Sequence, residues 1–476
     1  MASPSFRPLV LALLTLPLAC SSASGGAGAS EAGEGGSRDA TAPVDAHHDA
    51  TRPVDARHDA ISLDAGADAY VDAYLRAADG PIPGPDGTVF ALAPWNTAAG
   101  IAVNGFAAND AGHTDCRTEI CRHNENTDMI RWQGAIYLVH RTAMSQVLGP
   151  NSSILIYKSV DDGVSFRQLA RILAPETPLD ADDFATMGRD LRDPAFFIVT
   201  APDGSETLSL KAITRLPTDP GEVQTRDSNV DSISVGTSSS DGVHWSPLTR
   251  LAPTMWSFWR VKKIGAFYYS AAYHDGDSSV SLFISPDGIN WEQGAVVYGD
   301  SAATPLETEL VEMPNGNMLA LVRTDGDDAS LFGNNGMQTT QICWASPPFA
   351  TFDCSNTLLG DRLDGPVAFF WSARLFVVAR REVDTNGVRD RMRTALFELT
   401  PGNGGTWDDT GPLTLKDWGD LPSAGDTSYA GVAFVGDASA RVSWYSGDVA
   451  ADLDWLLSLV GPTNIWLGTI DFSKVN

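Results

Sequence analysis

Short runs of aromatic and β-branched residues, broken by Gly, Asn, Asp and Pro, follow one another from about residue 87 to the end of the chain. No long stretch in this region has the apolar spacing of an amphipathic helix. Six stretches share one plan, in which a strand, a turn with Gly or Asn and a second strand follow in order. These stretches are residues 128–141, 193–211, 258–274, 307–323, 366–381 and 429–445. The pattern predicts an all-β domain built from six similar hairpins.

The hairpins recur at intervals of about 60 residues, which suits a four-stranded sheet repeated around an axis. We therefore predict a six-bladed β-propeller over residues 86–476. The final strand, residues 464–472, is expected to close the ring by pairing with a segment near the start of the domain. In such a ring each blade buries its faces against its two neighbours.

Three turns carry a common mark of Ser, Asp, Gly and an aromatic residue: residues 159–166, 239–245 and 285–291. Here the Asp side chain can bond to backbone N–H groups of its own turn, and the Gly can take a positive φ. Such turns resemble the Asp-box of sialidases and related propellers. The resemblance implies a structural role for Asp161, Asp241 and Asp287.

The first 20 residues read as an export signal, because Arg7 precedes the apolar run Leu9–Ala19. The end of this run, Ala19-Cys20, resembles a bacterial lipoprotein signal. That resemblance implies lipidation of Cys20, and ordinary secretion is the alternative. Residues 21–85 are rich in Ala, Gly and Asp and cannot bury a core, so they are expected to form a disordered linker.

The charge and the apolar runs exclude two kinds of partner. The formal net charge of −28 arises from 60 acidic and 32 basic residues, and it disfavours nucleic acid and anionic lipid surfaces. No apolar run after the signal reaches the length of a membrane helix. We therefore expect contact with a membrane only through an N-terminal lipid anchor.

Four cysteines remain after Cys20, in two close pairs, Cys116 with Cys121 and Cys343 with Cys354. An oxidising compartment favours a disulfide within each pair. Neither pair has the spacing of a zinc site. We expect no metal and no cofactor.

The ends of the inner hairpins supply the candidate chemistry. In a blade the start of the first strand and the end of the second lie at the same rim. This rule selects Asp128, Arg192, Asp193, Trp259, Arg260, Glu307, Asp364 and Tyr429 at strand starts and His140, Arg141, His274, Arg323, Arg380, Arg381 and Tyr445 at strand ends. Such a ring of Arg, carboxylate, Tyr and His favours binding of a polar, anionic ligand.

The segment from Glu307 to Arg323 resembles the sialidase segment in which a Glu opens one strand and an Arg closes the next. The segment around Tyr429, Asp426-Thr-Ser-Tyr-Ala-Gly, is similar to the one that bears the sialidase nucleophile. The resemblance implies that Glu307 assists the nucleophile Tyr429 and that Arg323 is one of three arginines that clamp the substrate carboxylate. A neutral phenol becomes nucleophilic when a carboxylate takes its proton, and it does not repel an anionic sugar.

The chain departs from the sialidase pattern at two places. Asn126-Thr127-Asp128 stands where the family has its first arginine, so Arg122 or Arg192 would have to replace it. The acidic residue expected before Gly149 is absent, since residues 145–148 are Ser-Gln-Val-Leu. Arg380 is the first choice for the third arginine, with Arg381 and Arg391 as alternatives.

Two other functions stay open. Asp128, Asp193 and Glu307 resemble the three acids of five-bladed arabinosidase and invertase-type propellers, where they would serve as base, pKa tuner and acid. The missing acid and first arginine favour a propeller that binds a surface glycan or a partner without turnover.

The sequence as a whole predicts an exported, monomeric, sialidase-like exo-glycosidase that acts on a terminal sialic-acid-type sugar. Its predicted catalytic residues are Tyr429, Glu307 and Asp128. Its predicted substrate-binding residues are Arg323, Arg380, Arg192, Asp193, Arg141, Arg260 and Tyr445.

Overall fold

A computed structural model describes residues 74–76, 82–83, 89–90 and 93–475. Its internal gaps are 147–150, 176–178, 180–189, 217–230, 275–276, 326–339, 359–361, 386–387 and 408–409. Cys20 and the expected signal lie outside the described residues, as does most of the expected linker. Among the described helices, none is both long and apolar enough to cross a membrane.

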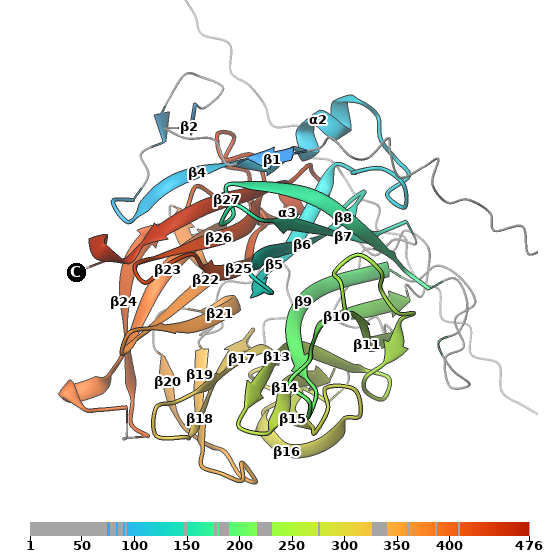
Figure 1. The fold of residues 1–476 in the computed structure, drawn as a ribbon. Coiled ribbons are helices and arrows are strands. Elements are labelled where there is room, and N and C mark those ends of the chain that lie inside the picture. The colour runs from blue at the N-terminus through green and yellow to red at the C-terminus, as the bar shows by residue number, and fades with distance from the viewer. Residues whose placement is uncertain are drawn as a thin grey trace, which may run out of the picture. The chain divides into compact units, whose positions relative to one another are not determined.

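Six antiparallel sheets surround one axis, with the first strand of each innermost (Figure 1). Blade 1 contains β5 (His123–Trp132), β6 (Ala135–Ala143), β7 (Ser153–Ser159) and β8 (Ser165–Leu173). Blade 2 contains β9 (Asp190–Thr200), β10 (Glu206–Leu216), β11 (Asp231–Ser239) and β12 (Thr249–Arg250). Blade 3 contains β13 (Trp256–Ile264), β14 (Phe267–His274), β15 (Ser279–Ser285) and β16 (Glu292–Gly299).

The second half of the ring follows the same plan. Blade 4 contains β17 (Pro305–Glu312), β18 (Met318–Thr324), β19 (Thr340–Ala345) and β20 (Asp353–Leu358). Blade 5 contains β21 (Asp364–Trp371), β22 (Arg374–Thr385), β23 (Val388–Pro401) and β24 (Leu413–Asp420). Blade 6 contains β25 (Thr427–Phe434), β26 (Ser439–Ser446), β27 (Asn464–Asp471) and, at its edge, β4 (Asn96–Val103). The predicted six-bladed, all-β propeller is confirmed.

The ring closes in blade 6, where the last strand pairs with the first long one. Strand β27 runs antiparallel to β4, with Trp466 opposite Ile101. The predicted closure is therefore confirmed. Part of the expected linker also joins the fold, because β1 (Tyr74–Arg76) pairs with the edge strand β8 of blade 1. Outside the blades lie the short pair β2 (Ile82–Pro83) and β3 (Val89–Phe90) and the helices α2 (Gly105–Asp110) and α3 (Trp455–Leu459).

The hydrophobic core lies between neighbouring blades. One cluster joins Leu319 and Leu321 of blade 4 to Val377 of blade 5, and another joins Phe376 of blade 5 to Trp444 of blade 6. Similar clusters fill the remaining interfaces of the ring. Each blade is thus stabilised by apolar burial on both faces, as a propeller requires.

The three Asp-containing turns have the predicted hydrogen bonding. Each lies between the third and fourth strands of its blade. Asp161 Oδ1 accepts a hydrogen bond from Ser165 N at 2.9 Å, and Asp241 Oδ1 and Asp287 Oδ1 each accept two from backbone N–H groups. Gly242 has a φ of 78°. These carboxylates serve their own turns.

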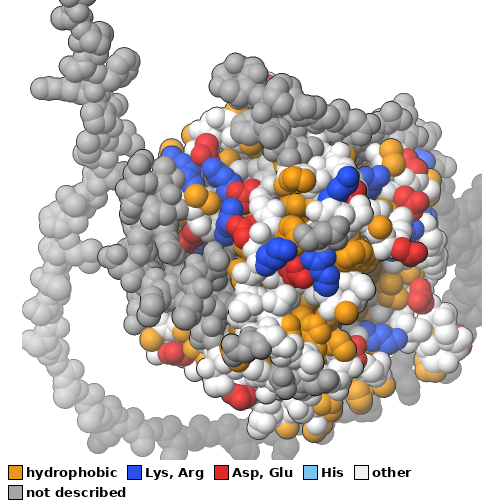
Figure 2. All heavy atoms as spheres, turned by 90° about the vertical axis from the view of Figure 1, so that its left-hand side faces the viewer, with side chains coloured by type: hydrophobic (Ala, Val, Ile, Leu, Met, Phe, Trp, Pro, Cys, Tyr) orange, Lys and Arg blue, Asp and Glu red, His pale blue; other side chains and the backbone are white. Residues whose placement is uncertain are grey.

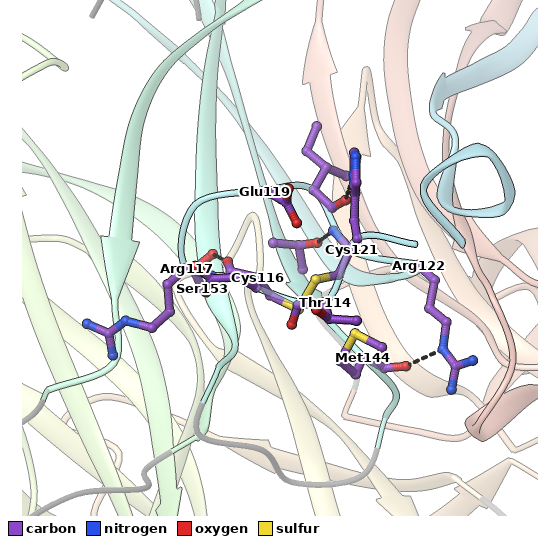
Figure 3. Close-up of a disulfide and its surroundings, with 12 residues drawn as sticks. Thr114, Cys116, Arg117, Glu119, Cys121, Arg122, Met144 and Ser153 are labelled. Atoms are coloured by element: carbon purple, nitrogen blue, oxygen red, sulfur yellow. Dashed lines mark hydrogen bonds between the residues drawn. A yellow bond between two sulfur atoms is a disulfide. The ribbon is translucent and has the colours of Figure 1, made fainter. Parts of the chain in front are cut away.

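Both predicted disulfides are present, Cys116–Cys121 and Cys343–Cys354. The first fastens the loop that leads into β5, beside Ser153 of β7 (Figure 3). The second links the neighbouring strands β19 and β20 of blade 4. Each bridge therefore fastens one blade locally.

Every inner strand carries an extra residue near its start. Two residues of the inner strand stand opposite one residue of its partner in all six blades, which is the arrangement of a β-bulge. The bulged pairs are Asn126–Thr127, Asp193–Pro194, Trp259–Arg260, Leu306–Glu307, Gly365–Pro366 and Tyr429–Ala430. A bulge re-aims the side chains beside it, so these six positions decide what faces the axis.

The surface beyond the core carries mixed charge. On the face shown in Figure 2, basic and acidic side chains are interspersed with apolar ones. Ion pairs occur outside the core as well, such as that of Arg381 on β22 with Asp420 on β24, at 2.7 Å.

Gly431 of β25 lies where blade 6 comes very close to the backbone of blade 1. A Cβ at this position would lie 2.5 Å from the carbonyl carbon of Asp128, in the backbone of β5. Gly431→Ala should therefore lower the free energy of unfolding by about 3 kcal/mol or more, since neither backbone can yield without strain. Urea denaturation measures the loss.

Gly436→Ala is the matched control. A Cβ there would meet nothing closer than Ser439 Oγ at 3.9 Å. If both variants unfold at the same urea concentration, the described contact between the two blades is incorrect.

Candidate active site

The inner strands bring a set of polar side chains to one end of the axis, which we call the axial mouth. It is formed by residues at or just before the bulges and by the facing ends of the second strands. At its centre are Tyr429 of β25, Glu307 of β17 and Arg323 of β18.

Tyr429, Glu307 and Arg323 form one hydrogen-bonded group. Tyr429 Oη donates to Glu307 Oε1 at 2.5 Å. Arg323 Nη1 donates to Glu307 Oε2 at 2.7 Å and to Tyr429 Oη at 3.3 Å. Glu307 and Arg323 are each 7% exposed. The structure thus brings together the three residues on which the sequence-based mechanism depends.

The electrostatics of Tyr429 keep its phenol protonated. Burial and then the Glu307 carboxylate raise the pKa of Tyr429 well above its usual range. The neutral phenol therefore donates to Glu307, which is the only group in this trio able to remove its proton.

The backbone around Tyr429 is held in an unusual conformation. Ser428 and Tyr429 have φ values of 96° and 45°, in the left-handed region that non-glycine residues rarely adopt. The ring is fixed by Trp259, whose centroid lies 5.5 Å away in an edge-to-face arrangement. A Cβ at Gly365 would lie 3.0 Å from the Tyr429 ring, so only Gly suits that bulge. Strain of this kind concentrates at functional sites.

Three arginines meet at the carboxylate of Asp364, beside the trio. Arg380 Nε donates to Asp364 Oδ2 at 3.1 Å, and Arg362 Nη2 donates to the same oxygen at 2.5 Å. Arg323 Nε lies 3.1 Å from Asp364 Oδ1. Arg380 also lies against the Tyr429 ring, 5.6 Å from its centroid. Arg362 escaped the sequence analysis because it precedes β21 and does not begin or end an inner strand.

Tyr445, a predicted substrate-binding residue, has an internal partner. Its hydroxyl donates to Asp426 Oδ1 at 3.0 Å, and it is 2% exposed. Arg380 Nη1 and Trp455 Nε1 bond to the same oxygen at 3.1 and 3.2 Å. Tyr445 therefore supports the wall of the axial mouth through Asp426.

Arg141 and Arg192 lie on the blade 1 and blade 2 side of the axial mouth. Arg141 Nη2 donates to Asp190 Oδ1 at 2.5 Å, and Arg192 Nε donates to Asp190 Oδ2 at 2.5 Å. Arg141 also bonds to Glu125. Burial alone would raise the pKa of Asp190, but the two guanidinium groups lower it to about 2. Both predicted ligand-binding arginines are thus paired with buried carboxylates.

His123, Glu125 and Asp426 offer ligand atoms within 4.8 Å of one another, and all three residues are buried. This donor set of imidazole and carboxylates could hold a divalent cation. The direct contact of His123 Nε2 with Glu125 Oε2, at 3.1 Å, also accounts for the arrangement.

Asp128, the third predicted catalytic residue, has other partners than Tyr429 and Glu307. Its Oδ2 accepts a hydrogen bond from Phe196 N at 2.7 Å, and its Oδ1 bonds to Arg260. Arg260 also donates to Ala430 O at 2.5 Å. Asp128 and Arg260 line a larger cavity of about 510 Å³ along the inner strands, beyond the bulges. Their pairing joins blades 1, 3 and 6.

Asp193 and Lys211 line a small cavity of about 10 Å³ with Tyr429, room for about one water. Burial raises the pKa of the Asp193 carboxyl, whose Oδ1 bonds to Asn126. Lys211 is 1% exposed, and burial lowers its pKa to about 7. Two groups with pKa values moved in these directions beside a phenol are suited to acid–base chemistry. Lys211 lies within β10, opposite Ala195 of β9. The predicted hairpin 193–211 ends on this residue, so the rim rule could have found it.

The other candidates for the arginine clamp lie elsewhere. Arg122 donates to Met144 O at 2.8 Å, next to the Cys116–Cys121 disulfide (Figure 3). Arg381 pairs with Asp417 and Asp420 of the edge strand β24. Arg391 lies 3.9 Å from Asp452. The two histidines predicted at strand ends also have partners within the protein. His140 contacts Tyr157 Oη at 3.3 Å, and His274 contacts Asp277 at 3.3 Å.

Comparison with known proteins gives similarity of fold. No family model and no curated protein matches the sequence. A structure of unknown function from Dyadobacter fermentans has a TM-score of 0.51 and 17% identity, over 73% of this chain and 94% of its own. The NanB sialidase from Streptococcus pneumoniae has a TM-score of 0.50 and 11% identity, over 76% of this chain and 70% of its own.

The sialidase of Trypanosoma rangeli in complex with sialic acid has a TM-score of 0.47 and 12% identity. The match covers 85% of this chain but spans only 59% of that one. Together with the six blades, the NanB match confirms the predicted sialidase-like fold.

Lys211 should make stability depend on pH. Its pKa of about 7 in the folded protein lies below the ordinary lysine value, so between about pH 7 and pH 10 the unfolded chain binds a proton that the folded one does not. The free energy of unfolding therefore rises with pH in this window. We expect Lys211→Met to remove about 2 to 4 kcal/mol of that rise, measured by urea denaturation.

Replacement of the exposed Lys474 by Met controls for the loss of one positive charge. Equal pH dependence in wild type and Lys211→Met would show that Lys211 is charged in the folded protein throughout the window.

Proposed function

We propose that the axial mouth is the active site of an exo-glycosidase that hydrolyses a terminal anionic sugar of the sialic-acid type. The observation that carries the proposal is the 2.5 Å hydrogen bond from Tyr429 Oη to Glu307 Oε1. The sialidase-like fold supports it, as does Arg323, which donates to both Glu307 and Tyr429. The ligand is a glycan, and the chemistry needs no metal or cofactor.

In the first step Tyr429 Oη forms a bond to the anomeric carbon of the sugar while the bond to the leaving oxygen breaks. The phenol proton passes to Glu307, and the Arg323 guanidinium stabilises the charge that develops between them. In the second step water attacks the same carbon, and Tyr429 leaves and regains its proton from Glu307. The sugar is released with its configuration retained.

We propose Asp193 as the acid that protonates the leaving oxygen and later takes a proton from the attacking water. Its raised pKa favours the protonated form, and it lines the same small cavity as Tyr429. The assignment would supply the acid that the sequence lacks before Gly149. Asp193 follows directly after Arg192 in the bulge of β9, and its Oδ1 bonds to Asn126 in the bulge of β5.

Binding of a glycan without turnover is the second candidate. It is favoured by the internal pairing of the arginines, since each guanidinium nitrogen of Arg323 and Arg380 contacts a protein oxygen. The three-carboxylate scheme has less support, because Asp128 uses both oxygens in contacts with Arg260 and Phe196.

We also propose that the protein is exported and held at a membrane surface by a lipid on Cys20, with the part of the linker before β1 as a tether and the propeller a monomer. The two disulfides support an oxidising compartment. The lipoprotein-type signal in the sequence supports the anchor.

Tyr429→Phe should abolish turnover of an aryl sialoside while the thermal unfolding temperature stays close to that of wild type. The change removes one oxygen, and with it the nucleophile. We expect kcat to fall by at least about 10³-fold. The rate at which the aryl alcohol is released measures kcat.

Two further variants separate the alternatives. Asp193→Asn should slow substrates with a poor leaving group more than the aryl sialoside, since only the former need an acid. If Tyr429→Phe is fully active and Asp128→Asn is inactive, the three-carboxylate scheme holds instead. If wild type hydrolyses no glycoside, the binding function stands.

Cys20→Ser should move the protein from the membrane fraction to the soluble exported fraction, because the variant lacks the lipid that is attached to Cys20. Fractionation and incorporation of labelled fatty acid measure the change. Labelled lipid on the Ser variant would refute the anchor at Cys20.

A further inference from the structure

The arginines of the axial mouth already hold a carboxylate, that of Asp364. Asp364 is 1% exposed and stands at the start of β21, one residue before the bulge. Its two oxygens contact Arg323, Arg362 and Arg380 at distances between 2.5 and 3.1 Å. Three converging guanidinium groups around one carboxylate form a recognition site for that group.

Each guanidinium nitrogen of the three arginines lies within ion-pair distance of a carboxylate oxygen, although Arg362 Nε forms no hydrogen bond. Arg323 uses Nε and Nη2 for Asp325 and Nη1 for Glu307. Arg362 uses Nη1 for Asp325 and its other two nitrogens for Asp364, and Nη2 also approaches Glu382 at 3.2 Å. Arg380 uses Nε and Nη2 for Asp364 and Nη1 for Asp426.

The local charge therefore disfavours a second carboxylate. Five acidic residues, Glu307, Asp325, Asp364, Glu382 and Asp426, contact three arginines in this cluster. An incoming carboxylate would have to displace Asp364 or bind next to it. Both are unfavourable in a buried site, because the repulsion between like charges is only weakly screened there.

We propose that Asp364 is a specificity-determining residue, an internal carboxylate that occupies Arg323, Arg362 and Arg380 and so weakens their binding of a ligand carboxylate. The inference rests on the proposed function in one respect, that the axial mouth binds a terminal sugar. It implies that the wild-type protein gains little from the carboxylate of a sialic acid.

The test compares the methyl glycoside of N-acetylneuraminic acid with the methyl ester of the same compound, by calorimetric titration. Wild type should bind the acid no more tightly than the neutral ester. Asp364→Asn should bind the acid at least about tenfold more tightly than wild type does, and its affinity for the ester should be unchanged. Asn keeps the size of the side chain and removes its charge.

Glu382→Gln is the matched control, since it also replaces a carboxylate that contacts Arg362 by an amide but leaves Asp364 in place. Its ratio of acid to ester affinity should change much less than that of Asp364→Asn. Because Asp364→Asn disturbs a buried cluster, the charge-balanced double variant Arg362→Gln/Asp364→Asn provides a second measurement, and it should also gain affinity for the acid.

An acid preference of about 100-fold in wild type would overturn the inference, as would an unchanged ratio in the folded variants. Turnover is measured separately with the aryl sialoside. If the ratio changes as expected and no glycoside is hydrolysed, Asp364 has the proposed role and the hydrolase assignment is wrong. If hydrolysis depends on Tyr429 while the ratio of acid to ester affinity stays constant, the hydrolase assignment is right and Asp364 does not have the proposed role.

Discussion

The repeated β-bulge is the constraint on which the rest of this structure depends. All six inner strands converge on one axis, and a regular strand would alternate its side chains between the two faces of its blade. One extra residue near the start of each strand interrupts that alternation and turns side chains such as Tyr429, Asp193 and Glu307 toward the axis. The apolar pattern resumes after the bulge, so the interfaces between blades are mainly apolar while the axial mouth is polar.

A polar mouth at the centre of a propeller carries an electrostatic cost. Each buried guanidinium must be paired, because an uncompensated charge away from water costs several kcal/mol, about 3 to 5 when one partner is lost. The chain meets this requirement by placing a carboxylate against each one, as Asp190 does for Arg141 and Arg192. These ion pairs fix the geometry of the mouth more than they stabilise the fold, since well-packed apolar residues would stabilise it as well.

The same pairing shapes the chemistry. The contact of Glu307 with Arg323 holds the carboxylate in place for the phenol of Tyr429. Asp193 and Lys211 line the small cavity beside Tyr429, where burial raises the pKa of the Asp193 carboxyl and lowers that of Lys211 to about 7. Shifts in these directions suit proton transfer. The arginines nearest to Tyr429 contact the carboxylate of Asp364, so residues whose type suits an anionic ligand have a carboxylate partner within the protein. An arginine can therefore be present at the axial mouth and still not be available to bind a ligand.

The sequence by itself determined the six hairpins, the closing strand, the disulfide pairs and the group of Tyr429, Glu307 and Arg323. These follow from local alternation, turn chemistry and the ends of hairpins, which depend on residues close together in the chain. The partners across the ring could not be read in this way. Asp128 lies beyond the bulge and pairs with Arg260 from a blade more than a hundred residues away, and Arg362 enters the mouth from outside any inner hairpin. Only the tertiary structure decided these contacts, because the register of six separate strands around one axis determines which buried charges meet.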